Sequence, residues 1–317
     1  MRAAVIAAPG HVEIEEVPVP EPGPGEVRIK LEGCGVCASN IPPWEGREWF
    51  RYPMPPGNLG HEGWGVIDAL GEGVTEFAVG DRVAFLSNSS YAEYDLAPPG
   101  SVVRLPKALG DRPFPGEPLG CAMNIFARSG IRAGDTVAVV GVGFLGALLT
   151  KLATDAGAKV IALARKPYAL EVARQMGAQE LIALDDAAIA KVSALTDGRF
   201  CDVVIECTGK QKPLDVSAEL TRERGRLVIA GFHQDGPRQI NMFLWNWRGL
   251  DVINAHEREN EVYLDGIRSA ADAVADGRLS PDPLYTHSLP LSELGEALDM
   301  TRERPEGFMK ALIRMEA

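Results

Sequence analysis

Two short segments near the start of the chain combine residue types that bind metal ions. They are Gly33-Cys34-Gly35-Val36-Cys37-Ala38-Ser39-Asn40 and Gly60-His61-Glu62-Gly63-Trp64-Gly65. Thiolate and imidazole are good zinc ligands, and a catalytic zinc typically takes three protein ligands and keeps one open position. Cys34-x-x-Cys37 is a poor redox pair, because such motifs belong near a thioredoxin-like βαβ unit and this segment lies far upstream of one. Alone, the two segments only suggest a metal site, since a single His is usually structural.

A glycine-rich turn forms a second candidate site. The apolar run 137–140 leads directly into Gly141-Val142-Gly143-Phe144-Leu145-Gly146, and an apolar, helix-like stretch follows. Gly141 would make the tight turn, Gly143 would let the backbone approach a pyrophosphate, and Gly146 would let the helix pack closely on the strand. The helix N-terminus adds free N–H groups and a positive dipole. In this strand–turn–helix context the motif predicts dinucleotide binding rather than a plain turn.

The end of the next strand bears on which dinucleotide is bound. An NAD site would place Asp or Glu there to bond the ribose 2′-hydroxyl, whereas this chain has Ala164-Arg165-Lys166. A small residue followed by cations leaves room for a 2′-phosphate and matches its charge. We therefore expect NADP(H) to be preferred over NAD(H). The alternative is that Arg165 and Lys166 are solvated residues in the loop before Pro167.

The pattern of elements changes along the chain. Roughly the first 110 residues carry short alternating runs separated by Pro and Gly, which predicts a small β-rich unit of barrel or sandwich type. From about residue 117 strands alternate with helices, which predicts an α/β doubly wound parallel sheet. Its expected strands lie at 137–140, 160–164, 181–184, 203–205, 227–230 and 252–255. We expect the first domain to be split, comprising residues 1–118 and 259–317, around a dinucleotide-binding domain of residues 119–258.

Composition excludes several classes of function. The chain has 317 residues, with 32 Lys and Arg against 44 Asp and Glu, for a net charge of −12. Such a balance opposes nucleic-acid binding, which depends on cations. No apolar run approaches the ~20 residues that span a bilayer. The first residues show no signal-peptide pattern, so we expect a cytoplasmic protein. Five cysteines, an odd number, argue against a disulfide framework.

These motifs together carry a family resemblance that covers nearly the whole chain. Further marks are Gly80-Asp81-Arg82-Val83, Glu206-Cys207-Thr208-Gly209 and the closing Lys310-Ala311-Leu312-Ile313. The chain resembles the zinc-dependent medium-chain dehydrogenases and reductases, the alcohol and polyol (sorbitol) dehydrogenase superfamily. The resemblance implies a Rossmann domain plus a GroES-like, β-rich catalytic domain.

The resemblance also implies roles for the metal segments. Cys37 and His61 would be zinc ligands, Glu62 a carboxylate that joins or exchanges on the metal, and Ser39 the hydroxyl that takes the proton of the substrate alcohol. A third ligand has two candidates, Glu117 and Cys121. Glu117 is preferred, because Gly116-Glu117-Pro118-Leu119 resembles the polyol-dehydrogenase pattern at its usual distance from the glycine loop. Cys121 would then be a buried apolar thiol, and the alternative for Glu117 is a carboxylate at a helix start.

Other positions follow or depart from the family pattern. The nicotinamide is expected near Thr208, Ala230, Gly231 and Phe232. Asn40 stands where the family often has Asp, which puts the tuning of the ligand His in doubt. A relay His is absent, because Ile41-Pro42-Pro43 occupies its usual stretch. The four-Cys lobe of a structural zinc is also missing, so we expect one catalytic zinc per chain and no structural zinc.

The expected function is hydride transfer between NADP(H) and an alcohol or ketone, with a polyol or cyclitol as a possible substrate. The small molecule would be the main partner, and the family forms homodimers or homotetramers. One alternative is a zinc-free reductase of the same superfamily acting on quinones or enoyl thioesters, against which Cys37, His61 and Glu62 count. Another is a non-catalytic NADP(H)-binding protein, which the Asn40 departure favours.

Overall fold

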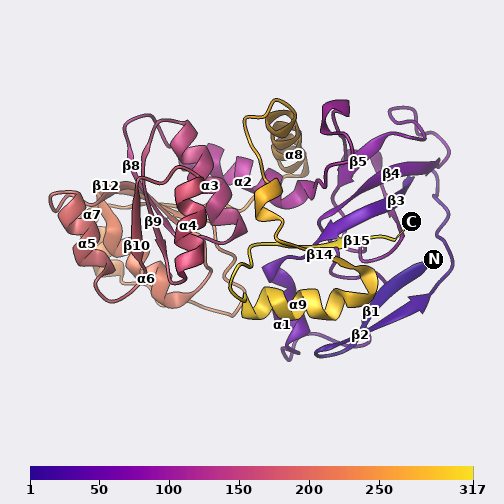
Figure 1. Ribbon diagram of the computed structural model, residues 1–317, viewed down its shortest axis with the longest axis horizontal. Helices are drawn as coiled ribbons and strands as arrows, with labels where there is room; N and C mark the ends of the chain where they lie inside the picture. Colours follow the sequence, from indigo (N-terminus) through magenta and orange to yellow (C-terminus); the bar gives the residue numbers. More distant parts are fainter. Residues whose placement is uncertain (317) are drawn as a thin grey trace. The chain divides into compact units, whose positions relative to one another are not determined.

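The computed structural model describes residues 1–316, and the chain divides into two compact units. The first unit comprises Met1–Cys121 together with the C-terminal segment that begins at Arg258, and the second is Ala122–Glu257. Figure 1 draws the chain coloured along its sequence, with the second unit in magenta and orange. Within the described residues, no helix has both the length and the apolar character that crossing a membrane requires.

The second unit is built on a six-stranded, fully parallel sheet in the order β10-β9-β8-β11-β12-β13. The strands are β8 (Thr136–Val140), β9 (Lys159–Ala164), β10 (Glu180–Ala183), β11 (Cys201–Glu206), β12 (Thr221–Ile229) and β13 (Asp251–Asn254). The connecting helices are α3 (Phe144–Asp155), α4 (Pro167–Gln175), α5 (Ala188–Leu195), α6 (Gln211–Leu220) and α7 (Met242–Arg248). The central strands are buried Val, Ile and Leu runs, as expected where helices cover both faces of a parallel sheet. The doubly wound sheet expected from the alternating pattern is therefore confirmed.

The strand order places several loops at one edge of this sheet. The chain moves outward from β8 to β9 and β10 and then returns to β11, so the order reverses between β8 and β11. Val140 pairs with Leu163 and with Glu206, and Glu206 pairs with Ile229. The strands thus end level with one another. Ligands of such sheets bind outside the carboxyl ends at this reversal, where the loops after β8, β9, β11 and β12 begin.

The first unit contains a seven-stranded mixed sheet and a hairpin. The sheet order is β14-β15-β3-β4-β5-β7, with β6 also paired to β3, and β1 pairs with β2. The strands are β1 (Arg2–Ala8), β2 (His11–Glu16), β3 (Val27–Gly35), β4 (Gly63–Leu70), β5 (Arg82–Phe85), β6 (Tyr94–Ala97), β7 (Val102–Arg104), β14 (His287–Pro290) and β15 (Ala311–Arg314). The helices are α1 (Ile41–Trp44), α2 (Gly116–Ser129, which continues into the second unit), α8 (Asn260–Ala275) and α9 (Leu294–Glu303).

Strand pairing in this sheet joins segments that lie far apart in the sequence. The end of β3 pairs with the start of β4 through Cys34 and Gly63, and with β15 through Cys34 and Ile313. The Cys segment follows β3, the His-Glu segment precedes β4, and Lys310 precedes β15. The three segments therefore meet at one end of three adjacent strands.

Candidate metal and cofactor sites

Cys37, His61 and Glu62 form a compact group of potential metal ligands. One ligand atom from each lies within 4.8 Å of the other two. Cys37 also precedes a single 3-10 turn, Ala38–Asn40, and its Sγ accepts a hydrogen bond from the Ser39 backbone N–H at 3.5 Å. Cys37 and His61 are half-buried, whereas Glu62 is fully buried. Sequence reasoning named these three residues, and the strand pairing of β3 and β4 brings them together.

The orientation of His61 leaves one ring nitrogen free for a ligand. Its Nδ1 lies 2.9 Å from the Leu59 carbonyl oxygen. Because a carbonyl only accepts, Nδ1 carries a proton, and Nε2 is the ring nitrogen that can bind a metal ion when it is deprotonated. The Ser39 Oγ lies 3.4 Å from that Nε2. Asn40, which stands where the family often has Asp, donates from its amide to the same Leu59 carbonyl at 3.2 Å and to Tyr91 Oη at 2.8 Å.

The charges around His61 favour a cation. Burial lowers the pKa of His61, but Cys37 first, then Glu117 and Glu62, outweigh it and raise the pKa to about 10. Anionic groups that stabilise the protonated imidazole create a negative field at Nε2. The same field would attract a metal ion in place of the proton. The donor set of thiolate, imidazole and carboxylate is one that zinc accepts.

The Glu62 carboxylate has a partner from the far end of the chain. Lys310 Nζ donates to Oε1 at 2.7 Å and lies 2.5 Å from Oε2, and both side chains are almost fully buried. Burial lowers the pKa of Lys310, but the charge and hydrogen bond of Glu62, together with the charges of Cys37 and Glu117, outweigh it, so that the net pKa is raised. Oε2 makes no hydrogen bond within the described part of the chain, and a Cβ on Gly35 would come within 1.8 Å of it. Gly35 therefore leaves the space that this carboxylate fills.

Glu117 and Cys121, the two candidates for a third ligand, share one hydrogen-bond network. Glu117 lies in the first turn of α2, and its Oε1 accepts from the Tyr263 hydroxyl of α8. Cys121 Sγ lies 2.9 Å from that hydroxyl and 3.4 Å from the same Oε1. Burial first, and then the Glu117 charge, raise the pKa of the Cys121 thiol. The expectation of an apolar setting for Cys121 is wrong, because the thiol has polar partners and is only half-buried. Glu117 does not belong to the compact group of Cys37, His61 and Glu62.

The glycine loop of the second unit has the geometry that close backbone packing requires. Gly141 follows β8 with a φ of 97°, in the left-handed region. A Cβ on Gly146 would stand 2.1 Å from the Gly141 carbonyl oxygen, which is backbone and cannot yield. Gly143 is the N-cap of α3 and supplies no side-chain cap, and Phe144 and Leu145 open the helix. Helix α3 thus begins at a glycine, whose backbone a phosphate group could approach closely, and the helix dipole is positive at this end.

The residues expected to select the dinucleotide end strand β9. Ala164 is buried at its last position, and Arg165 and Lys166 that follow are exposed. Helix α4 begins at Pro167, with Lys166 as its N-cap. Two exposed cations thus stand at the same sheet edge as the glycine loop.

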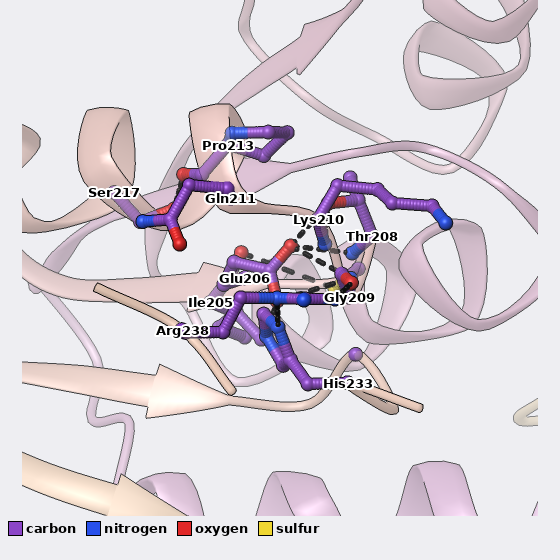
Figure 2. Close-up of polar contacts among 12 residues, drawn as sticks. Ile205, Glu206, Thr208, Gly209, Lys210, Gln211, Pro213, Ser217, His233 and Arg238 are labelled. Carbon is purple, nitrogen blue, oxygen red and sulfur yellow. Dashed lines mark hydrogen bonds and ion pairs between the residues drawn. The ribbon is translucent and has the colours of Figure 1, made fainter. Parts of the chain in front are cut away.

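The loops after β11 and β12 are tied together by a buried carboxylate (Figure 2). Glu206, the last residue of β11, is fully buried. Its Oε1 accepts from the Thr208 N–H at 2.7 Å, from the Thr208 hydroxyl, and from the Gly209 N–H at 3.0 Å. Its Oε2 lies 3.0 Å from His233 Nε2.

Of the expected nicotinamide contacts, Ala230 and Gly231 are buried after β12, and Phe232 is 52% exposed. Sequence reasoning missed the roles of Glu206, His233, Lys310 and Tyr263. Glu206 and Lys310 were noticed only as parts of longer family marks, and no local pattern singles out the other two.

Comparison with known proteins places the chain in a family. The family described as the alcohol dehydrogenase GroES-like domain matches residues 23–107, and that of the zinc-binding dehydrogenases matches residues 145–267. The sorbitol dehydrogenase of Halalkalibacterium halodurans is 31% identical, and the aligned region covers 91% of this chain and 92% of that protein.

Solved structures agree with this assignment. A zinc-binding dehydrogenase of Sinorhizobium meliloti, crystallised with NADP, superposes with a TM-score of 0.85 at 28% identity, covering 99% of this chain and 98% of that one. The 2R,3R-butanediol dehydrogenase of Bacillus subtilis has a TM-score of 0.85 at 25% identity and 99% coverage of both chains. The Rossmann sheet with a GroES-like domain is thereby confirmed. The chain belongs to the zinc-type medium-chain dehydrogenases, in their sorbitol-dehydrogenase-like branch, and is an NAD(P)-dependent alcohol dehydrogenase.

Proposed function

We propose that this protein is a zinc-dependent dehydrogenase that interconverts a secondary alcohol of the polyol class and its ketone, with NADP(H) preferred over NAD(H). The observation that carries the proposal is the compact group of Cys37, His61 and Glu62. The similarity to a sorbitol dehydrogenase and to an NADP-bound dehydrogenase supports the substrate class and the cofactor. Residues 1–118 and 259–317 would form the catalytic domain and residues 119–258 the cofactor domain.

One catalytic zinc per chain would be held by Cys37, His61 and Glu117, with Glu62 able to exchange onto it. When bound, the ion supplies Lewis acidity that lowers the pKa of an alcohol oxygen or polarises a carbonyl. The Leu59 carbonyl keeps His61 in the tautomer that presents Nε2. Lys310 neutralises Glu62 while that carboxylate is off the metal. Tyr263 holds one oxygen of Glu117, which leaves the other for a ligand bond.

Ser39 is the proposed proton carrier. Its Oγ stands 3.4 Å from His61 Nε2, the ring nitrogen that would bind the ion. In the oxidation direction the hydroxyl accepts the proton of the substrate alcohol and passes its own proton to water or to the cofactor ribose. When bound, the nicotinamide would supply the hydride acceptor for the carbinol carbon, so that alcohol and NADP⁺ would give ketone, NADPH and one proton.

The cofactor would lie along the carboxyl edge of the parallel sheet. The loop of Gly141, Gly143, Phe144, Leu145 and Gly146 would bind the pyrophosphate, and the segment from Ala164 through Arg165 and Lys166 would bind the 2′-phosphate. Thr208 and the segment Ala230, Gly231 and Phe232 would contact the nicotinamide end. We further propose a cytoplasmic homodimer or homotetramer.

Metal analysis and a substrate panel test the proposal. We expect about one zinc per chain, retained by Cys121→Ala and lost by Glu117→Ala. Turnover of ketones or polyols should have a higher kcat/KM with the phosphorylated cofactor. A zinc-free protein that reduces quinones or enoyl thioesters would refute the proposal, as would a zinc-loaded protein inactive on every alcohol and ketone. Retention of zinc by Glu117→Ala with loss in Cys121→Ala would exchange the two ligand assignments.

A further inference from the structure

The two loops at the expected nicotinamide end pack backbone against backbone. Gly209, after β11, has a φ of 69°, and a Cβ there would come within 2.4 Å of the Phe232 carbonyl oxygen. A Cβ on Gly231, after β12, would come within 2.2 Å of the Gly209 nitrogen. The shape of each loop therefore depends on the other, and no side chain can fill the space between them.

A closed ring of hydrogen bonds joins these loops at Gly209 (Figure 2). The Gly209 N–H donates to Glu206 Oε1 at 3.0 Å, and Glu206 Oε2 lies 3.0 Å from His233 Nε2. Arg238 Nε donates to His233 Nδ1 at 2.9 Å. Arg238 Nη2 donates to the Gly209 carbonyl oxygen at 2.8 Å, which closes the ring. Both polar backbone groups of Gly209 are therefore engaged.

The proton on each bond of the ring is determined by chemistry. An arginine Nε–H can only donate, so His233 Nδ1 must accept. The imidazole is then neutral with its proton on Nε2, which donates to the Glu206 carboxylate. The buried Glu206 thus has protein donors at both oxygens, three from Thr208 and Gly209 and one from His233. The positive charge of Arg238 therefore acts on the Glu206 carboxylate through the neutral His233 ring, and the two charged groups do not form a direct ion pair.

We propose that His233 and Arg238 are positioning residues for the nicotinamide end of the cofactor. They hold Thr208, Gly209 and the Phe232 backbone in one arrangement before the nucleotide binds, so that binding does not have to order the two loops. This inference rests on the proposed function, because it assigns the loops to the cofactor. Neither residue is proposed to touch the reacting atoms.

Two substitutions of His233 separate hydrogen bonding from mere packing. His233→Gln keeps one donor and one acceptor on a side-chain amide, whereas His233→Leu has similar bulk and neither group. We expect His233→Leu to raise the Kd for NADPH, measured by the change in nucleotide fluorescence, about tenfold or more. A tenfold change in Kd corresponds to a binding free energy of about the size that one hydrogen bond contributes. His233→Gln should stay within about threefold of the wild type. His11→Leu, at an exposed histidine of the β1–β2 hairpin, is the matched control and should bind as the wild type does.

Arg238→Lys provides a second test at another half-buried loop residue of the ring. Lysine keeps the charge, but its single nitrogen lacks the planar fork that spans His233 Nδ1 and the Gly209 carbonyl. We expect the Kd for NADPH to rise severalfold, while zinc content, which depends on the first unit, stays unchanged.

Different results would refute the positioning role of His233 and Arg238 and the proposed dehydrogenase function. Wild-type affinity in His233→Leu, or in Arg238→Lys, would overturn the inference alone. Equal loss in His233→Gln and His233→Leu would also overturn it, because the hydrogen bonds would then not matter. Failure of the wild type to bind either NADPH or NADH would refute the proposed function, and the inference with it.

Discussion

Replacing Lys310 with methionine should destabilise the protein strongly, because it leaves the buried Glu62 carboxylate without its charge partner. Glu62 has no exposed surface, and Lys310 is 5% exposed. The Lys310 Nζ atom donates a hydrogen bond to Glu62 Oε1, and Glu62 Oε2 accepts none within the described residues. Removing one partner of a buried pair leaves an uncompensated charge, which costs about 3–5 kcal/mol. Methionine fills a similar volume, so the loss of packing contributes little.

The double variant Glu62→Gln with Lys310→Met shows whether the uncompensated charge of Glu62 causes the loss of stability. It removes both charges, and replacement of a whole buried pair is often close to neutral. Urea unfolding of chelator-treated protein is the assay, because the free Glu62 could otherwise bind a metal ion. If the free energy of unfolding falls by about 3 kcal/mol per molar urea, the single variant should lower the urea midpoint of unfolding by about 1 M or more. The double variant should recover most of that shift.

A matched control removes a lysine from an exposed pair. Lys212 lies 2.8 Å from Asp186, and their side chains are 77% and 94% exposed. Lys212→Met should leave the unfolding midpoint where it is, since exposed pairs contribute little. The reasoning is refuted if Lys310→Met shifts the midpoint no more than this control. It is also refuted if the double variant is as unstable as the single one.

Three further predictions concern the second unit. Gly146→Ala should abolish NADPH binding in fluorescence titrations, because the new Cβ would stand 2.1 Å from the Gly141 carbonyl oxygen; wild-type affinity would show that the loop can adjust. Arg165→Ala should lower kcat/KM for NADPH about 10- to 100-fold, the value of a hydrogen bond to a charged phosphate, and leave NADH unchanged; an equal loss for both cofactors would contradict the 2′-phosphate role. Burial raises the pKa of Asp202, but the Thr136 N–H and Arg222 outweigh it and hold the pKa below its usual value. This stabilisation exists at neutral pH and is lost as the pH falls. Asp202→Asn should therefore lower the free energy of unfolding by about 1 kcal/mol at pH 7, and urea titrations should show the difference closing below about pH 3.9.

The fold was predictable where local sequence patterns determine local structure. The turn from Gly141 to Gly146 lies between an apolar strand and an apolar helix. Two of its glycines have a local steric reason, the left-handed φ of Gly141 and the Gly141 carbonyl oxygen beside Gly146. The alternation of strands and helices after residue 117 likewise predicted the parallel sheet, because crossover connections leave few other arrangements. The residues of the two metal segments could be named for the same reason, since ligand chemistry is a property of side-chain type. The cofactor and metal roles of individual residues stay predictions.

Only the tertiary structure decided which partners complete these sites. Glu62 and Lys310 are 248 residues apart, and Glu117 and Tyr263 are 146 apart. His233 reaches Glu206 because β11 and β12 pair in a register that ends both strands level. Such contacts depend on the strand order and on the pairing register, because a shift of one residue would turn every side chain of a strand to the opposite face of the sheet. A sequence read in windows contains no signal for them. The sequence by itself thus determined which side chains could do chemistry, and the packing of distant strands decided their charge partners, tautomers and orientation.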